Sequence, residues 1–382
     1  MSFIPRTIFP EYRATLAHFK GHQNQALKVM QNLLHQINFV IELRDARAPL
    51  STTNPLLRQL FRGKKRIVVY TKRDKSGLTP KLLDAVEDIL AKAPAIEPRD
   101  TTKSSEVRKP LALRMMETKD TFDEMEQSKK KPVMIDSRSV KDAKKVIGLL
   151  KQEYQSFFPL PPLGLRFTVI GMPNVGKSTL VNSLRSEGGG ASGGKRRKVA
   201  RTGDQAGVTR AVSEVIRISK TPEILLFDTP GILMPQIKDS KQLFALYLIG
   251  SIDASTDAIG GVDPVIAIDY LLYIMNLNNP FMYKHICKPT NDVIEFLEAV
   301  AKKTNNYDIK IIDGKKQKVA SHNSAALDVV QWYRKGKFNN LVLDEELALL
   351  KHKYQLENNQ KRIQAKQHRD AARKNAESEI IQ

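Results

Sequence analysis

The strongest constraint on the fold of this chain is the segment 171–179, whose sequence is GMPNVGKST. It fits the pattern G-x-x-x-x-G-K-[ST], in which a strand leads into a glycine-rich loop and then into a helix. Backbone N–H groups of such a loop bind anions at the helix N-terminus, a lysine (Lys177) reaches the terminal phosphates, and a hydroxyl (Ser178) ligates Mg²⁺. We therefore expect a nucleoside triphosphate with Mg²⁺ here. The other predicted nucleotide contacts in this loop are Asn174, Val175, Gly176 and Thr179.

Alternation of short apolar runs with helix-like segments predicts a doubly wound, parallel α/β domain over residues 23–235. Charge-rich residues 93–131 and the glycine-rich, then basic residues 188–201 are expected to be insertions in it. From 236 to 345 the apolar residues recur at helical spacing, which predicts a second, mostly α-helical domain. The runs expected to form buried strands are 39–43, 67–70, 132–135, 167–170, 212–218 and 224–227.

The charge balance indicates a polyanionic partner. The 382 residues include 62 Lys and Arg against 41 Asp and Glu, a formal net charge of +21. A nucleotide does not require such a surplus, whereas nucleic acid or an acidic membrane surface does. Cys287 is the only cysteine, which excludes a disulfide framework, and no run approaches the roughly 20 apolar residues of a transmembrane helix.

Both ends of the chain leave alternatives open. Residues 1–22 form a basic arm whose composition resembles a mitochondrial presequence, and an ordinary basic arm fits the same residues equally well. The tail, residues 346–382, is expected to be helical or disordered, and its stretch 351–374 holds eight Lys or Arg against Glu357 and Asp370 and few large apolar side chains. This stretch is expected to be either a solvated helix or a nucleic-acid-binding arm.

A second motif indicates the base. Residues 71–74, TKRD, follow the strand-like run 67–70 and approximate the pattern Asn-Lys-x-Asp. The Asp74 carboxylate can accept two N–H bonds from the Watson–Crick edge of guanine, and the Lys72 stem can cover the ring. Adenine offers no matching pair of donors, and an unpaired carboxylate costs over ~1–3 kcal/mol, so GTP should be preferred. Thr71 replaces the usual asparagine, and we expect this change to lose an amide that could bond the base and brace the phosphate loop.

A third motif, DTPG at residues 228–231, also follows a strand-like run. Asp228 is expected to hold the water shell of Mg²⁺, and the Gly231 N–H to contact the γ-phosphate. Thr209 lies between this motif and the phosphate loop and can add a second hydroxyl to Mg²⁺ when its loop closes. Ile232 occupies the position where many GTPases use glutamine to orient water, which an aliphatic side chain cannot do.

The order of these motifs is permuted, because the base motif precedes the phosphate loop. Ser137 and Arg138 follow a further strand-like run and are expected to complete the base site. This order resembles the circularly permuted GTPases of the RbgA/YlqF ribosome-assembly family, in particular their mitochondrial relatives. Residues 45–51 (DARAPLS) and 333–338 (YRKGKF) add to the resemblance, whereas Thr71, Arg138 and the two insertions depart from it. Because the helical domain follows 228–231 directly, we expect movement of that loop to reach it.

The resemblance implies a slow GTPase that assembles the large ribosomal subunit and binds its RNA. It also implies a mitochondrial matrix location, with or without peripheral attachment to the inner membrane, and a monomer off the ribosome. His22 matches a family histidine that orients the attacking water, and Asn174 matches a position that helps to bind K⁺. A surface histidine and a loop-bracing asparagine are the alternatives. The predicted catalytic set is His22, Lys177 and Thr209.

Two other functions stay open on the sequence alone. One is an RNA-binding scaffold that keeps GTP without hydrolysing it, because the water-orienting glutamine is missing. The other is a kinase that transfers the γ-phosphoryl group to a small molecule. No acceptor site is visible for it, and it would leave Asp74 unexplained.

Overall fold

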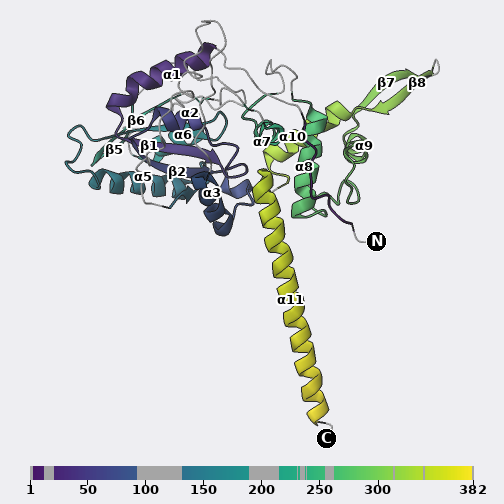
Figure 1. Ribbon diagram of the computed structural model, residues 1–382. Coiled ribbons are helices and arrows are strands. Elements are labelled where there is room, and N and C mark those ends of the chain that lie inside the picture. The colour runs from purple at the N-terminus through teal and green to yellow at the C-terminus, as the bar shows by residue number, and fades with distance from the viewer. Residues whose placement is uncertain are drawn as a thin grey trace, which may run out of the picture.

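The computed structural model describes residues 3–12, 21–92, 131–188, 215–229, 231–232, 237, 239–253, 262–312, 315–338 and 340–380. An α/β domain lies beside a helical domain, and one long helix extends away from both (Figure 1). The predicted insertions 93–131 and 188–201 fall almost entirely outside the described residues.

Six strands form the central sheet, in the order β3-β2-β1-β4-β6-β5. Five of the predicted strand runs are present in it and pair in parallel. The sixth, predicted at 212–218, is corrected: β5 begins at Val215, pairs antiparallel with β6 and exposes alternate residues as an edge strand. The strands are β1 (Phe39–Asp45), β2 (Lys65–Thr71), β3 (Val133–Met134), β4 (Leu165–Gly171), β5 (Val215–Lys220) and β6 (Glu223–Phe227).

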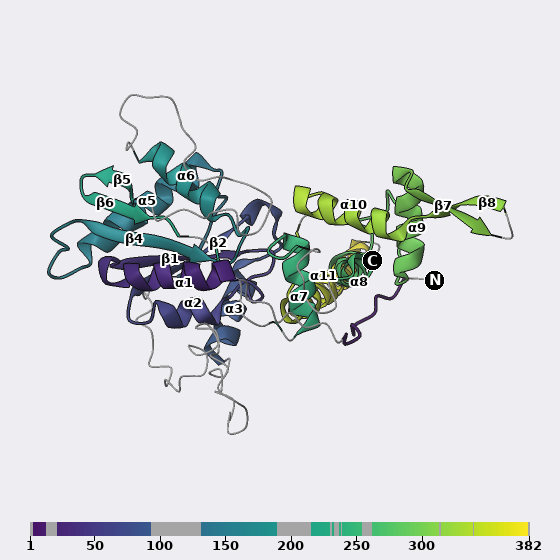
Figure 2. The same cartoon turned by 90° about the horizontal axis from the view of Figure 1, so that it is seen from above.

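Helices cover both faces of the sheet, α1 and α2 on one and α5 and α6 on the other (Figure 2). Strand β1 shows why: Phe39, Ile41 and Leu43 face the core under α5 and α6, whereas Val40 faces the core under α1 and α2. Side chains of a strand alternate between its faces, so burial on both requires the continuously apolar run that the sequence has. The helices are α1 (Gly21–Leu33), η1 (Leu34–Gln36), α2 (Pro55–Leu60), η2 (Arg73–Lys75), α3 (Pro80–Lys92), α5 (Val140–Gln155) and α6 (Lys177–Glu187).

The second domain is helical with one hairpin. Its central helix α8 buries every side chain from Ala267 to Leu277, and α7, α9 and α10 pack around it. The hairpin β7–β8 was not expected from the sequence. The last helix, α11, contains the basic tail, which is therefore helical. The elements are α7 (Ser240–Ile249), α8 (Pro264–Asn278), α9 (Val293–Thr304), β7 (Tyr307–Ile312), β8 (Lys315–Ala320), α10 (His322–Lys335) and α11 (Glu345–Ile380).

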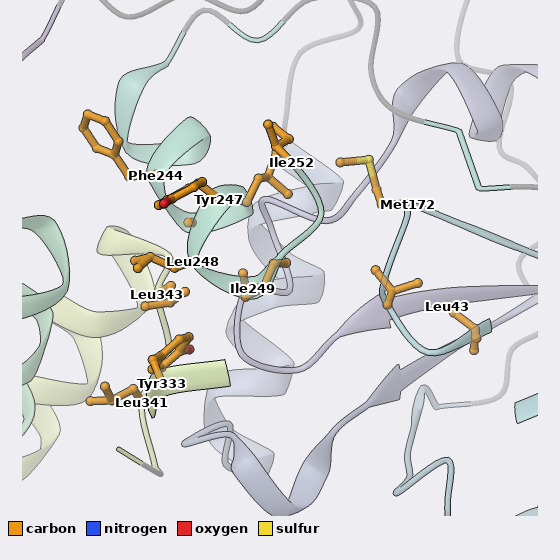
Figure 3. Close-up of a cluster of buried hydrophobic side chains, with 14 of the residues drawn as sticks. Leu43, Met172, Phe244, Tyr247, Leu248, Ile249, Ile252, Tyr333, Leu341 and Leu343 are labelled. Carbon is orange, nitrogen blue, oxygen red and sulfur yellow. The ribbon is translucent and has the colours of Figure 1, made fainter. Parts of the chain in front are cut away.

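One hydrophobic core runs through both domains (Figure 3). Leu43 at the end of β1 and Met172 in the phosphate loop belong to the same buried cluster as Ile249 and Ile252 around the end of α7. Apolar burial is the main stabilising term in folding, so the two domains are joined by the same interaction that stabilises each. Among the described residues, no helix is both long and apolar enough to cross a membrane.

Part of the basic amino-terminal arm belongs to the helical domain. Phe9 is buried against Tyr270, with ring centroids 5.1 Å apart, and against Tyr273 at 5.5 Å. Arg6 donates to the Asp269 backbone oxygen at 2.9 Å and pairs with its carboxylate. Residues 3–12 therefore pack on α8 as part of the domain surface.

Replacing Phe9 by Ala should destabilise the helical domain by about 3–5 kcal/mol, because it removes a fully buried aromatic ring. Urea denaturation followed by the fluorescence of Trp332, the only tryptophan and a residue of α10, measures this change. Ile8→Ala is the matched control, since Ile8 is 80% exposed. Equal unfolding midpoints for the two variants would contradict the packing role of residues 3–12.

Candidate nucleotide site

The phosphate loop has the predicted strand–loop–helix geometry. Strand β4 ends at Gly171, and α6 begins at Lys177 after Gly176. Both glycines have positive φ, +153° and +99°. A Cβ on Gly171 would lie 2.5 Å from the Leu43 backbone oxygen, so the loop packs against β1 more closely than any side chain permits.

Lys177 is buried at the centre of this loop. Its Nζ donates to the backbone oxygens of Met172 at 2.6 Å and Gly171 at 3.1 Å. Burial lowers the pKa of Lys177 to about 7, against the opposing attraction of Asp228. A Cβ on Gly231 would lie 2.6 Å from this Nζ, so the 228–231 motif lies directly on the lysine. The two phosphate-facing motifs are thus brought together as the sequence predicts.

Thr71 braces the phosphate loop, which corrects the expectation that its substitution for asparagine loses the brace. The Thr71 hydroxyl donates to the Val175 backbone oxygen at 2.6 Å and lies 3.2 Å from that of Arg44. A threonine hydroxyl can make this bond in place of an amide because it carries a donor of its own. The base motif and the phosphate loop are therefore joined across 104 residues of sequence.

Lys72 makes a second connection between the two loops. It has φ +56°, and its Nζ donates to the Asn174 backbone oxygen at 2.8 Å and pairs with Asp45 at 3.0 Å. Burial, and then the nearby charge of Arg47, lowers the pKa of Lys72 to about 8, while Asp45 opposes both. The lysine thus fixes the base loop against the phosphate loop.

Asp45 and Arg47 form a buried ion pair beside the site that sequence reasoning did not identify. Arg47 donates to Asp45 through two side-chain nitrogens, at 3.0 and 2.8 Å, and both residues are buried. Burial raises the pKa of Asp45, but Arg47 and Lys72 outweigh it and hold the pKa well below its usual value. The only signal was the family-like stretch 45–51, whose contacts the sequence could not identify.

The remaining base-site residues converge on the same edge. The Ser137 hydroxyl is buried and has no hydrogen-bond partner among the residues that the structure describes. It lies 3.3 Å from where a Cβ on Gly176 would be, beside Thr71. Arg138 donates to the Asp74 carboxylate at 3.0 Å on the exposed rim. An orphaned buried hydroxyl at the phosphate loop fits a site that a nucleotide completes.

Asn174 joins the loop to the helical domain. Its Nδ2 donates to the Gly250 backbone oxygen at 2.6 Å, and the neighbouring Ser251 hydroxyl donates to the Pro173 backbone oxygen at 2.8 Å. Gly250 and Ser251 follow the last turn of α7. These bonds agree with the alternative in which Asn174 braces the phosphate loop. The braced loop lies against the second domain.

Ser178 and Asp228 carry the oxygen donors expected for Mg²⁺. Ser178 lies in the first turn of α6, and Asp228 directly follows β6. Hydroxyl and carboxylate oxygens are hard donors, and Mg²⁺ typically takes only one or two protein ligands besides phosphates and water. The donor set therefore fits Mg²⁺. Thr209, the third predicted ligand, lies outside the described residues.

Ile232 has no access to the nucleotide side of the loop. It is fully buried in a cluster with Leu27 and Met30 of α1, and its backbone oxygen accepts from Asn54 at 2.9 Å. His22 lies in the first turn of α1. Since α1 leads through η1 directly into β1, it runs back along that strand and starts at the sheet edge where the phosphate loop lies. The amino end of α1, which includes His22, therefore lies at that edge of the sheet.

Comparison with known proteins finds GTPases. A family model described as 50S ribosome-binding GTPase matches residues 166–304, which include the phosphate loop and exclude the base motif. Mitochondrial GTPase 1 of Saccharomyces cerevisiae is 36% identical over 316 residues, 78% of this chain and 75% of the relative. Mitochondrial ribosome-associated GTPase 1 of Xenopus tropicalis is 30% identical, over 90% and 99% of the two chains. A GDP-bound structure of TM YlqF is 20% identical, with a TM-score of 0.47, over 82% of this chain and 97% of that chain.

The buried amine of Lys177 makes nucleotide binding depend on pH. Its pKa of about 7 leaves it mostly neutral at about pH 8 and charged at about pH 6. A bound triphosphate favours the ammonium form, so binding at the higher pH should take up about one proton and at the lower pH almost none. Affinity should accordingly fall as pH rises above about 7.

Titration calorimetry of GTP with Mg²⁺ in buffers of different ionisation enthalpy measures the proton uptake. Data at the lower pH serve as the control in the same protein. Uptake that is the same at both pH values would show that Lys177 is already charged before the nucleotide binds.

Proposed function

Because the chain belongs to the mitochondrial GTPase 1 family and is a GTP-hydrolysing enzyme, we propose that it serves assembly of the large mitochondrial ribosomal subunit. In this proposal it binds ribosomal RNA or precursor particles in its GTP state and leaves after hydrolysis. The observation that carries the proposal is the pair of bonds that tie Asn174 and Pro173 of the phosphate loop to the end of α7. They give the phosphate site a direct mechanical connection to the second domain.

The bound nucleotide would contact residues of both the phosphate loop and the base motif. Lys177 exchanges its two loop carbonyl partners for phosphate oxygens, and the Ser137 hydroxyl gains the partner it lacks. Asp74 accepts from the guanine edge, with Arg138 on the outer side of the same carboxylate. Ser178 and Asp228 would hold Mg²⁺, which when bound neutralises charge on the phosphates.

Hydrolysis needs a group that orients water, and Ile232 is not that group because it is buried. We assign this role to His22, brought in when the ribosomal partner fixes the amino-terminal segment, with Thr209 closing over the metal. Asn174 is the proposed K⁺ contact, and equal turnover in potassium and sodium chloride would exclude it. Relatives named as GTPases argue against the kinase and against the scaffold that does not hydrolyse GTP.

The relatives' names and the net charge support the proposed cellular setting. We place the protein in the mitochondrion, in the matrix, with peripheral contact to the inner membrane through its basic surface. Off the ribosome it acts as a monomer. Cosedimentation with isolated large subunits in GTP, GDP and nucleotide-free buffer tests the whole proposal, and equal binding in all three would reject it.

Asp74→Asn should reduce the preference for GTP over ATP by about 1–3 kcal/mol, since the amide offers guanine one acceptor and one mismatched donor. The same variant should gain affinity for xanthosine triphosphate, whose 2-oxo group accepts from that donor. Competition binding with the three nucleotides measures both changes. Asp136→Asn, on the neighbouring loop and bonded to Arg138, is the control and should keep the preference. An unchanged preference in Asp74→Asn would remove the guanine assignment.

His22→Ala should lower turnover stimulated by large-subunit particles by about a hundredfold while leaving GTP affinity intact, because positioned proton-transfer groups contribute about 10²–10⁴-fold. Single-turnover hydrolysis with and without particles measures this effect. His35→Ala, an exposed histidine in η1 at the other end of α1, is the matched control. Equal stimulated rates in the two variants would rule out His22 as the water-orienting group.

A further inference from the structure

The β7–β8 hairpin projects from the helical domain, away from the GTPase domain (Figures 1 and 2). Its strands pair from Tyr307↔Ala320 to Ile312↔Lys315. Residues 307–311 and 316–318 are exposed, and Ala320 at the base packs against the core. An isolated two-stranded ribbon is marginally stable in water because it has no core of its own. A ribbon exposed on both faces is therefore suited to contact something outside the chain.

The two faces of this hairpin differ in character. Directly opposed residues of an antiparallel pair share a face, so the register places Lys318 beside Ile309 and Lys316 beside Ile311. Tyr307 lies on the same face, and Ile309 and Ile311 are 69% and 73% exposed. We call these five residues the ribbon face. It combines an apolar stripe with a basic stripe and contains no acidic residue.

The surroundings of the hairpin are also basic. Lys302 and Lys303 end α9 just before β7, and the Lys303 Nζ donates to the His285 backbone oxygen at 3.2 Å. Partial burial, and then the charges of Lys303 and Lys337, lowers the pKa of His285, which indicates a positive field at this surface. Within the described part of the chain, neither lysine of the ribbon face has an ion-pair partner.

We propose that the ribbon face docks on structured RNA, with Lys316 and Lys318 at phosphates and the apolar stripe against exposed base and sugar faces. The proposal rests on the proposed function and names the surface that contacts the RNA. RNA presents phosphates and flat apolar base faces side by side, which matches the two stripes. A protein partner would have to supply an acidic and an apolar stripe at the same spacing, and the net charge of +21 favours the nucleic acid.

The test uses the full chain and protein-free large-subunit RNA extracted from mitochondria. Lys316→Glu/Lys318→Glu should weaken binding by about tenfold or more and reduce the salt dependence by about 0.7–0.9 per lost phosphate contact. Ile309→Ser/Ile311→Ser should weaken binding with the salt dependence unchanged. The control Lys141→Glu/Lys145→Glu makes the same charge change at exposed positions of α5. GTP turnover without RNA should be the same in all variants.

Each alternative outcome is distinct. If the wild-type protein binds RNA and both ribbon variants bind as tightly, or no more weakly than the α5 control, the ribbon proposal is wrong and the proposed function stands. If the variants lose binding to intact particles but keep binding to free RNA, the ribbon contacts a protein, and the RNA assignment is overturned. If the wild-type protein binds neither particles nor free RNA, the proposed function itself fails.

Discussion

The buried carboxylate of Asp45 is the interaction on which the rest of the structure depends. It pairs with the positive charges of Arg47 and Lys72, which are themselves buried or partly buried. Lys72 also bonds the phosphate loop, and Arg47 lies under the Tyr333 ring at 5.4 Å and 3.4 Å from the Ile249 backbone oxygen of α7. Buried charges are tolerated only when they are paired and hydrogen-bonded. One carboxylate at the end of β1 thus fixes base loop, phosphate loop and helical domain together.

These contacts change how the phosphate site is connected to the helical domain in the permuted chain. From the sequence, the helical domain was expected to respond through the 228–231 loop that precedes it in the chain. The structure adds a shorter connection, because Asn174 and Pro173 of the phosphate loop bond Gly250 and Ser251 directly. Arg334 of α10 in turn donates to two carbonyl oxygens in the last turn of α7, at 2.6 and 3.2 Å. The phosphate site therefore contacts the second domain whatever the 228–231 loop does.

Much of the fold could be predicted because its signals are local. The phosphate loop, the TKRD motif and the strands beside them are short patterns whose own residues are enough to indicate the local structure. Long-range contacts could not be predicted: Thr71 bonds Val175 across 104 residues, and Phe9 packs on Tyr270 of α8, far along the chain. The hairpin was missed for a different reason, because its signal was overlooked. Tyr307, Ile309 and Ile311 alternate with polar residues, and the Asp-Gly pair at 313–314 is typical of a two-residue hairpin turn.

Helix α10 leads from the base of the hairpin to the end of α7. It begins at His322, next to the base of the hairpin, and its last turn contains Arg334, which caps α7 beside Gly250. A helix of 14 residues spans about 20 Å at ~1.5 Å per residue and bends little over that length. The contacts therefore run from Asn174 to Gly250 after α7, from the last turn of α7 to Arg334, and along α10 to the residue that follows the hairpin. The proposed dependence of RNA binding on the nucleotide would use this path.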